Sequence, residues 1–153
     1  MARTLARQFL PAVEEACAPF QFALSTRAGT DCVGHAVRLL TDLDPHATLL
    51  SIDGVGAYDN VRRMAMPPKL DSLPKARAML PFVCLSYGKP SRYSWGHESG
   101  DTWFVEQAEG GEQGDPLMPM LFALGIHDAL AGAKSELRAG EHLFAFLDDV
   151  YAV

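Results

Sequence analysis

The last eleven residues of the chain, 143–153, place two adjacent carboxylates, Asp148 and Asp149, between two apolar runs. These runs are rich in aromatic and β-branched residues, which predicts two strands joined by a tight turn at the carboxylates. Two like charges packed against a hydrophobic hairpin destabilise the fold unless a cation neutralises them. A hard divalent cation such as Mg²⁺ is the simplest neutraliser, because it binds carboxylate oxygens.

An Asp-Asp pair is also common in exposed hairpin turns, and the dipeptide alone favours that plain interpretation. A third carboxylate favours the metal-binding interpretation instead. Residues 47–52 form a nearly continuous apolar run, which predicts a central strand covered on both faces, and Asp53 follows at its carboxyl end. If this strand lies beside the C-terminal hairpin, the three carboxylates are expected to meet in one pocket that holds a pair of metal ions.

The rest of the chain has the periodicity of helices, with one further hairpin. Alternation around a polar turn predicts that hairpin over residues 91–95 and 102–106. Pro67 and Pro68 are expected to break helical structure. Helices are predicted over residues 2–18, 30–44, 57–64, 73–85 and 116–131. The predicted fold class is therefore α+β, with a mainly antiparallel sheet backed by helices.

Composition is that of an ordinary globular domain, with 153 residues of which 48% are hydrophobic and 21% charged. No apolar run approaches the length of a membrane span and the amino terminus lacks a signal-peptide core, so we expect a soluble, intracellular protein with no membrane partner. The net charge of −6 argues weakly against nucleic-acid binding. However, a basic middle, residues 62–92, precedes an acidic end, so one face could bind phosphates and another a metal.

Four segments, taken in order, resemble those of reverse transcriptases. Residues 50–61 (LSIDGVGAYDNV), 111–122 (GEQGDPLMPMLF) and 146–149 (FLDD) resemble palm motifs A, B and C. Residues 21–31 (QFALSTRAGTD) resemble the fingers segment that precedes motif A. Within that family the likeness is to the LINE-type, non-LTR retrotransposon enzymes. It implies a polymerase palm-like sheet within a single partial domain, with fingers-like helices in residues 1–46 and the palm in 47–153.

The resemblance assigns the chemistry to the three carboxylates. It implies that Asp53 and Asp148 hold two Mg²⁺ ions, or Mn²⁺ in their place, with Asp149 as a nearby carboxylate. The implied reaction is RNA-directed DNA synthesis, in which the partners are an RNA template with a DNA primer and deoxynucleoside triphosphates.

Three further residues match positions that contact substrates in the family. Tyr58 falls on the steric-gate position, where an aromatic ring under the sugar excludes a 2′-hydroxyl and selects deoxynucleotides. Gln113 and Gly114 would lie against the template and the incoming nucleotide. Tyr58 could instead be a half-buried core aromatic. Arg62 and Arg63 are interpreted as part of a solvated basic face.

Two departures from the family pattern accompany the likeness. Met118 stands where a small polar residue is usual, and Glu112 is acidic where a neutral or basic residue is commoner. No later palm motifs or thumb follow the terminal hairpin, so we expect a fragment or degenerate copy of a retroelement polymerase. The alternatives are a catalytically inactive remnant, acting at most as a nucleic-acid- or protein-binding module, and an unrelated metal-dependent phosphohydrolase.

Overall fold

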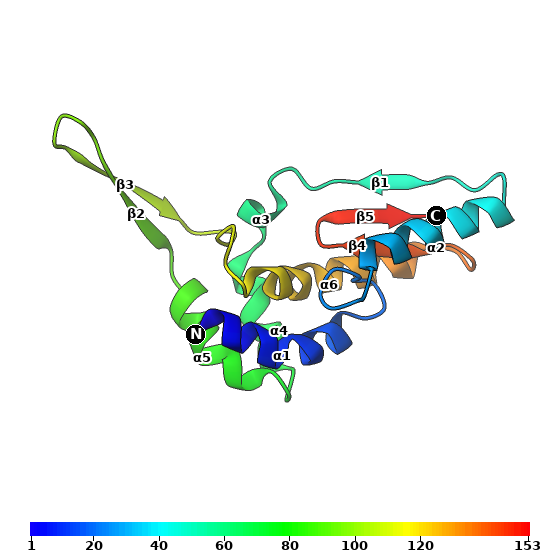
Figure 1. Cartoon of the computed structure of the whole chain (residues 1–153), viewed down its shortest axis with the longest axis horizontal. Helices are drawn as coiled ribbons and strands as arrows, with labels where there is room; N and C mark the ends of the chain where they lie inside the picture. Colours follow the sequence, from blue (N-terminus) through cyan, green and yellow to red (C-terminus); the bar gives the residue numbers. More distant parts are fainter.

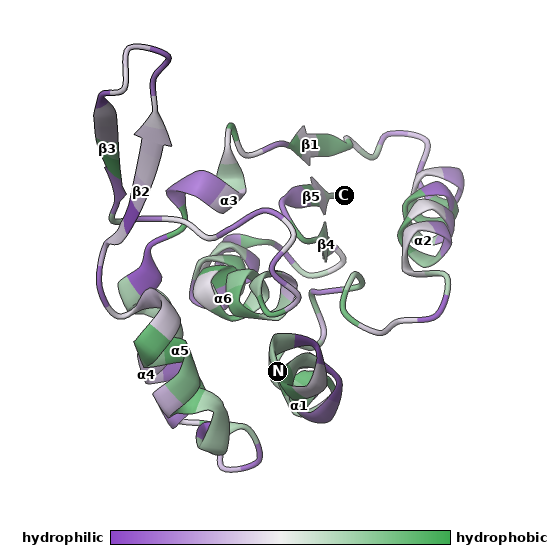
Figure 2. Ribbon diagram, turned by 60° about the vertical axis from the view of Figure 1, so that its left-hand side comes forward, coloured by the Kyte–Doolittle hydropathy of each residue, from purple (hydrophilic) through white to green (hydrophobic).

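Helix α6 (Met118–Glu136) runs through the centre of the computed structural model, which describes residues 1–153. Its residues from Met120 to Leu124 are all buried, so this part of the helix is enclosed on every side, as in a core helix. The main helices packed with it in the core are α1 (Ala2–Cys17), α4 (Met66–Asp71) and α5 (Leu80–Tyr87). Figure 2 shows α6 between these helices and a three-stranded sheet.

The sheet is antiparallel, and its strand order is β1-β5-β4. Its strands are β1 (Leu50–Ile52), β4 (Leu143–Phe146) and β5 (Asp149–Ala152). The α+β class and the pairing of the 47–52 region with the C-terminal hairpin are confirmed. Strand β5 is central, since it bonds to β1 through Ile52↔Val150 and to β4 through Phe146↔Asp149.

The prediction that residues 47–52 form a central, doubly covered strand is wrong. Strand β1 lies at the edge, and the side chains of Leu50 and Ile52 remain 54% and 47% exposed. The buried apolar contacts of the sheet lie instead at β4, where Leu143 and Ala145 pack with Leu130 of α6. An apolar run indicates that a strand can be buried. Whether the strand is central or at the edge depends on whether other strands pair with both of its sides.

The chain following α1 also joins the sheet. Residues 20–22 run parallel to β4 through a bridge between Gln21 and Ala145. The amide of Phe22 donates to the carbonyl of Ala145 at 2.9 Å, and the amide of Ala145 donates to the carbonyl of Phe20 at 2.8 Å. Helix α2 (Gly29–Leu43) then passes beside the sheet, as Figure 1 shows. Gly29 is required here, because a Cβ at this position would clash with the Phe22 carbonyl oxygen.

The short helices between the sheet and the hairpin differ from the predicted ones. Helix α3 (Ala57–Asn60) is followed by the 3-10 helix η1 (Arg63–Ala65), and Pro67 and Pro68 lie in the first turn of α4 instead of breaking a helix. Proline fits there because the first helical N–H groups have no partner within the helix. No helix has both the length and the apolar character that crossing a membrane requires.

The helix predicted over residues 73–85 begins later, with the 3-10 helix η2 (Arg77–Met79) leading into α5. The inward face consequently carries Met79, Val83 and Tyr87, whereas Leu85 is 83% exposed. The predicted hairpin is confirmed as β2 (Ser91–Gly96) and β3 (Thr102–Gln107). It projects from the rest of the molecule (Figure 1).

The expectation that Arg63 belongs to a solvated face is wrong, because Arg63 is only 3% exposed. Its Nε donates to the Gly110 carbonyl at 2.6 Å, and its Nη1 donates to the Lys89 carbonyl and to Ser91 Oγ at 3.1 Å each. The guanidinium lies over the Tyr87 ring at 5.4 Å from its centroid. Arg63 thus joins the start of η1 to the base of the hairpin and to the segment before α6.

We predict that Arg63→Lys lowers the free energy of unfolding by about 2 kcal/mol, because an ammonium group cannot reproduce the planar set of donors that a guanidinium offers. The neighbouring Arg62 is exposed, so Arg62→Lys is the matched control and should change stability by less than about 0.5 kcal/mol. Urea unfolding followed by circular dichroism measures both. Equal stabilities of the two variants would contradict the role given to Arg63.

Candidate active site

Strand pairing brings the three predicted carboxylates to one end of the sheet. The ladder ends with Ile52 opposite Val150, so Asp53 follows β1 at the place where Asp149 begins β5. Asp148 immediately precedes Asp149. Residues that are 95 positions apart in the sequence therefore meet because antiparallel pairing places the end of one strand beside the start of its neighbour.

The turn itself contains Leu147 and Asp148, and not Asp148 and Asp149 as a turn at the carboxylate pair implied. Asp149 already belongs to β5, where it pairs with Phe146. Leu147 has a φ of 56°, a left-handed conformation that glycine usually supplies in two-residue hairpin turns. The turn therefore carries a backbone cost that the surrounding contacts must offset.

The two adjacent aspartates face different surroundings. Asp148 is half-buried and lines a cavity of about 390 Å³ together with Ile52, Val150 and residues of α6. Asp149 is exposed and lines a different cavity of about 390 Å³, between the sheet and α2. This separation follows from the alternation of side chains across a strand.

The carboxylate oxygens are of the type that Mg²⁺ prefers, but the arrangement does not close into a metal site. No group of three or more His, Cys, Asp or Glu side chains lies close enough together to hold a metal ion. The expected single pocket shared by Asp53, Asp148 and Asp149 is therefore not formed. The three carboxylates share an end of the sheet without sharing one cavity.

The three residues predicted to contact substrates lie together. Tyr58, Gln113 and Gly114 line one open cavity of about 460 Å³, which is completed by the turn leading into α6. The Tyr58 ring stacks on Phe122 of α6, with centroids 4.7 Å apart and planes inclined by 3°. Burial, with a smaller contribution from the negative charge of Asp148, raises the pKa of Tyr58 to about 12. Phe122 also lines the cavity of Asp148, so the Tyr58 ring and the carboxylate turn both lie against this part of α6.

The loop that carries Gln113 and Gly114 is bonded directly to the segment that carries Tyr58. The amide of Gly111 donates to the Tyr58 carbonyl at 2.9 Å, and the amide of Gly110 donates to the Val61 carbonyl at 2.8 Å. Gly110 has a φ of 70°, and a Cβ there would clash with the Asp59 backbone. Glycine is thus needed because two backbones approach closely at this point.

Asp115 fixes the other end of this loop. One carboxylate oxygen accepts a hydrogen bond from the Leu117 amide at 2.9 Å, and the other accepts one from the Tyr87 hydroxyl. Helix α6 begins at Met118, so Asp115 caps the turn that precedes the helix. Burial and the bond to Asp115 raise the pKa of Tyr87 well above its usual range.

Sequence reasoning missed two residues that support this site, Arg63 and Gln21. Gln21 is only 6% exposed, and its side chain makes two hydrogen bonds to the backbone of Leu147 in the carboxylate turn. The only sequence signal was its place at the start of the fingers-like segment, where no role was assigned to it.

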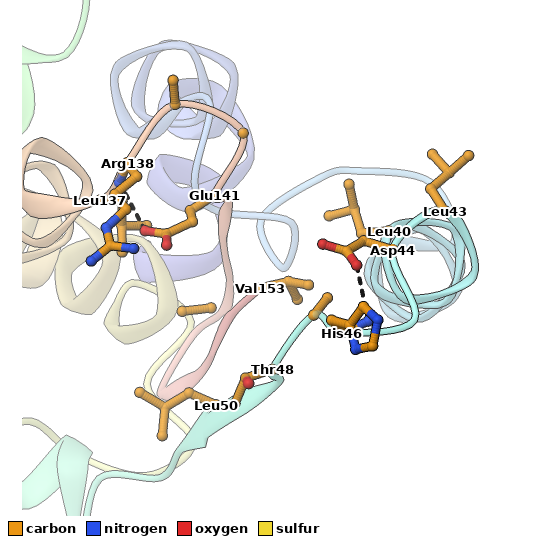
Figure 3. A pocket seen from close by; sticks show the side chains of 14 residues that line it. Leu40, Leu43, Asp44, His46, Thr48, Leu50, Leu137, Arg138, Glu141 and Val153 are labelled. Atoms are coloured by element: carbon orange, nitrogen blue, oxygen red, sulfur yellow. Dashed lines mark hydrogen bonds between the residues drawn. The ribbon is translucent and has the colours of Figure 1, made fainter.

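Another cavity, of about 690 Å³, contains none of the predicted residues. It lies between the C-terminal end of α2, the loop after α6 and Val153, and Figure 3 shows its lining side chains. The lining residues Leu50 and Ala152 are paired at the opposite end of the β1–β5 ladder from Asp53. This larger cavity is therefore separate from the carboxylate end.

Comparison with protein-family models and with curated proteins finds no match for this chain. Among solved structures, apo telomerase from Candida tropicalis, truncated from its C-terminal domain, is similar over 99% of this chain with a TM-score of 0.66 and 14% sequence identity. The chain covers 34% of the length of that telomerase chain. Telomerase is a reverse transcriptase. The chain has a reverse-transcriptase-like α+β fold.

We predict that the free energy of unfolding falls as the pH rises from 10 towards 12, in part through Tyr58. An unfolded tyrosine loses its proton near pH 10, whereas the pKa of folded Tyr58 is raised to about 12. The unfolded state therefore releases its proton first, and stability that is fully present below pH 10 is lost through this interval. Tyr58→Phe keeps the stacked ring without an ionisable group. Urea unfolding at pH 8 and pH 11 should show a smaller loss for this variant, and identical losses would contradict the assignment.

Proposed function

We propose that the chain is the fingers and palm portion of an RNA-directed DNA polymerase of the LINE-type, non-LTR retrotransposon class. Residues 1–46 would form the fingers-like part and residues 47–153 the palm. The reaction is template-directed nucleotidyl transfer. The 3′-hydroxyl oxygen of a DNA primer attacks the α-phosphorus of a deoxynucleoside triphosphate, a new phosphodiester bond forms, and pyrophosphate leaves.

One observation carries this proposal. Tyr58 lines one cavity with Gln113 and Gly114, and its ring stacks on Phe122, which lines the cavity of Asp148 at the end of the sheet that Asp53 also occupies. These residues come from three separate parts of the chain, and each matches its motif position in the same family. A shared fold alone would not demand these residue types at these places.

The proposal includes Mg²⁺, or Mn²⁺, held by Asp53, Asp148 and Asp149. When bound, such ions supply positive charge that stabilises the transferring phosphoryl group. Oxygen donors suit both ions, but the three carboxylates do not form a metal-binding group in this arrangement. We therefore assign only two roles to the protein residues. Asp53, Asp148 and Asp149 place negative charge at the end of the sheet, and Tyr58 positions the sugar.

We predict that Asp53→Asn and Asp148→Asn each reduce primer extension on an RNA template by at least about 100-fold, because a neutral amide replaces a carboxylate that would hold a metal ion beside the phosphoryl group. Asp42 is exposed on α2, away from the carboxylate end, so Asp42→Asn is the matched control and should retain activity. Extension is measured with a labelled primer, Mg²⁺ and deoxynucleoside triphosphates. Full activity of either active-site variant would contradict the proposal.

A second prediction concerns sugar selection. Tyr58→Val removes the ring and should lower the preference for deoxynucleotides over ribonucleotides by about tenfold or more, because the 2′-hydroxyl is then no longer excluded. Tyr58→Phe retains the ring stacked on Phe122 and should keep the preference. Single-nucleotide incorporation with matched deoxy and ribo substrates measures the ratio. An unchanged ratio in Tyr58→Val would remove Tyr58 from the proposed substrate contacts.

The alternative is a catalytically inactive remnant that binds nucleic acid or a protein. Two observations favour it, namely the lack of a three-ligand metal group and the exposure of Trp95 and Trp103, at 71% and 62%, on the projecting hairpin. The extension assay separates the two functions. A remnant would show no extension in either the wild type or Asp53→Asn, while it could still bind primer-template.

A further inference from the structure

Gln21 makes a two-point contact with the carboxylate turn. Its Nε2 donates to the Leu147 carbonyl at 3.2 Å, and its Oε1 accepts a hydrogen bond from the Leu147 amide at 3.0 Å. Both the donor and the acceptor of one side-chain amide are thus used by the two backbone groups of a single residue. Because Gln21 is 6% exposed, water does not readily replace these bonds.

The backbone on both sides of Gln21 is held as well. The bonds of Phe20 and Phe22 to Ala145 fix residues 20–22 against β4, two residues before Leu147. The side chain of Gln21 therefore extends from a fixed base along the strand to the turn. Leu147, the residue that it holds, has the unfavourable left-handed conformation, and the next residue is Asp148.

We propose that Gln21 is a positioning residue for nucleotidyl transfer, which fixes the Leu147–Asp148 turn and thereby the place of the Asp148 carboxylate. This inference rests on the proposed function for its catalytic consequence, but its structural part does not. Without the clamp, the left-handed Leu147 would lose two of the bonds that hold it, and the turn could relax to other conformations. Asp148 would then leave its position near Tyr58.

The test uses the full chain with Gln21→Met, which keeps the length of the side chain and removes both bonds, and Gln21→Glu, which keeps an acceptor and removes the donor. Gln8→Met on the exposed face of α1 is the matched control. Three quantities are measured: amide hydrogen exchange at Leu147, the carbon resonance of the Tyr58 ring in tyrosine-labelled protein, and the kcat and KM of primer extension. Asp148→Asn supplies the reference shift of the Tyr58 resonance.

In Gln21→Met we expect Leu147 exchange to rise about tenfold, corresponding to the loss of one typical hydrogen bond. The Tyr58 resonance should move in the direction seen in Asp148→Asn. We expect kcat to fall by about 10- to 100-fold with KM within about threefold of wild type, because a small displacement of a reacting group lowers the rate more than substrate binding. Gln21→Glu should keep the Leu147 amide protected yet still lower kcat. Gln8→Met should change none of these.

The proposal is overturned if Gln21→Met leaves Leu147 exchange and the Tyr58 resonance unchanged. It is also overturned if exchange rises while the Tyr58 resonance and kcat stay at wild-type values, since Gln21 would then act on the fold alone. If the wild type extends no primer, the proposed function fails, and the exchange and resonance measurements alone decide whether Gln21 positions Asp148.

Discussion

Pairing of β5 on both sides is the interaction on which the candidate site depends. Strand β5 bonds to β1 and to β4, and its first residue, Asp149, lies at the end where β1 delivers Asp53. A slip of one residue between β1 and β5 would place the side chains of Ile52 and Val150 on opposite faces of the sheet. A slip of two residues would move Asp53 about 7 Å along the ladder. The register therefore determines whether the carboxylates share one end of the sheet.

Helix α6 links that end of the sheet to the predicted substrate cavity. It contributes Phe122 to the stack with Tyr58, and its first turn follows the loop that holds Gln113 and Gly114. That loop is itself bonded to the Tyr58 and Val61 carbonyls. Because the first half of α6 is buried in the core, these parts rest on a well-packed element. Functional residues are commonly carried on loops of a rigid scaffold, because the scaffold holds those loops in position.

The parts of this structure that sequence predicts well are those set by local pattern. Strict alternation identified the β2–β3 hairpin, and apolar spacing identified α1 and α6. The order of the motif-like segments identified Tyr58, Gln113 and Gly114, which line one cavity. The charge pattern did not indicate that Asp148 and Asp149 face different cavities. That division follows from a turn displaced by one residue, which places Asp149 in β5.

The parts that sequence did not predict depend on long-range partners. The edge position of β1 is decided by β5, a strand almost a hundred residues away. The sequence suggests that Arg63 is a surface residue like Arg62, but its burial is explained by partners distant in the sequence: the carbonyls of Lys89 and Gly110, the Ser91 hydroxyl and the Tyr87 ring. Gln21 likewise has no local partner. In both Arg63 and Gln21, polar side-chain atoms bond to backbone groups that are distant in the sequence, and backbone groups leave no signature in residue type.

The sheet is also expected to be less stable than the helical core. The larger core cluster joins α1, α4, α5 and α6, and the partly buried Leu147 of the carboxylate turn packs against it, whereas β4 packs in a small cluster of Phe20, Leu130, Leu143 and Ala145. The clamp between Gln21 and Leu147 spans 126 positions, and closing so long a loop slows folding more than it lowers stability. The helical core can therefore persist while the sheet end opens locally. A change at the turn would then alter the site long before it is visible in the unfolding of the whole chain.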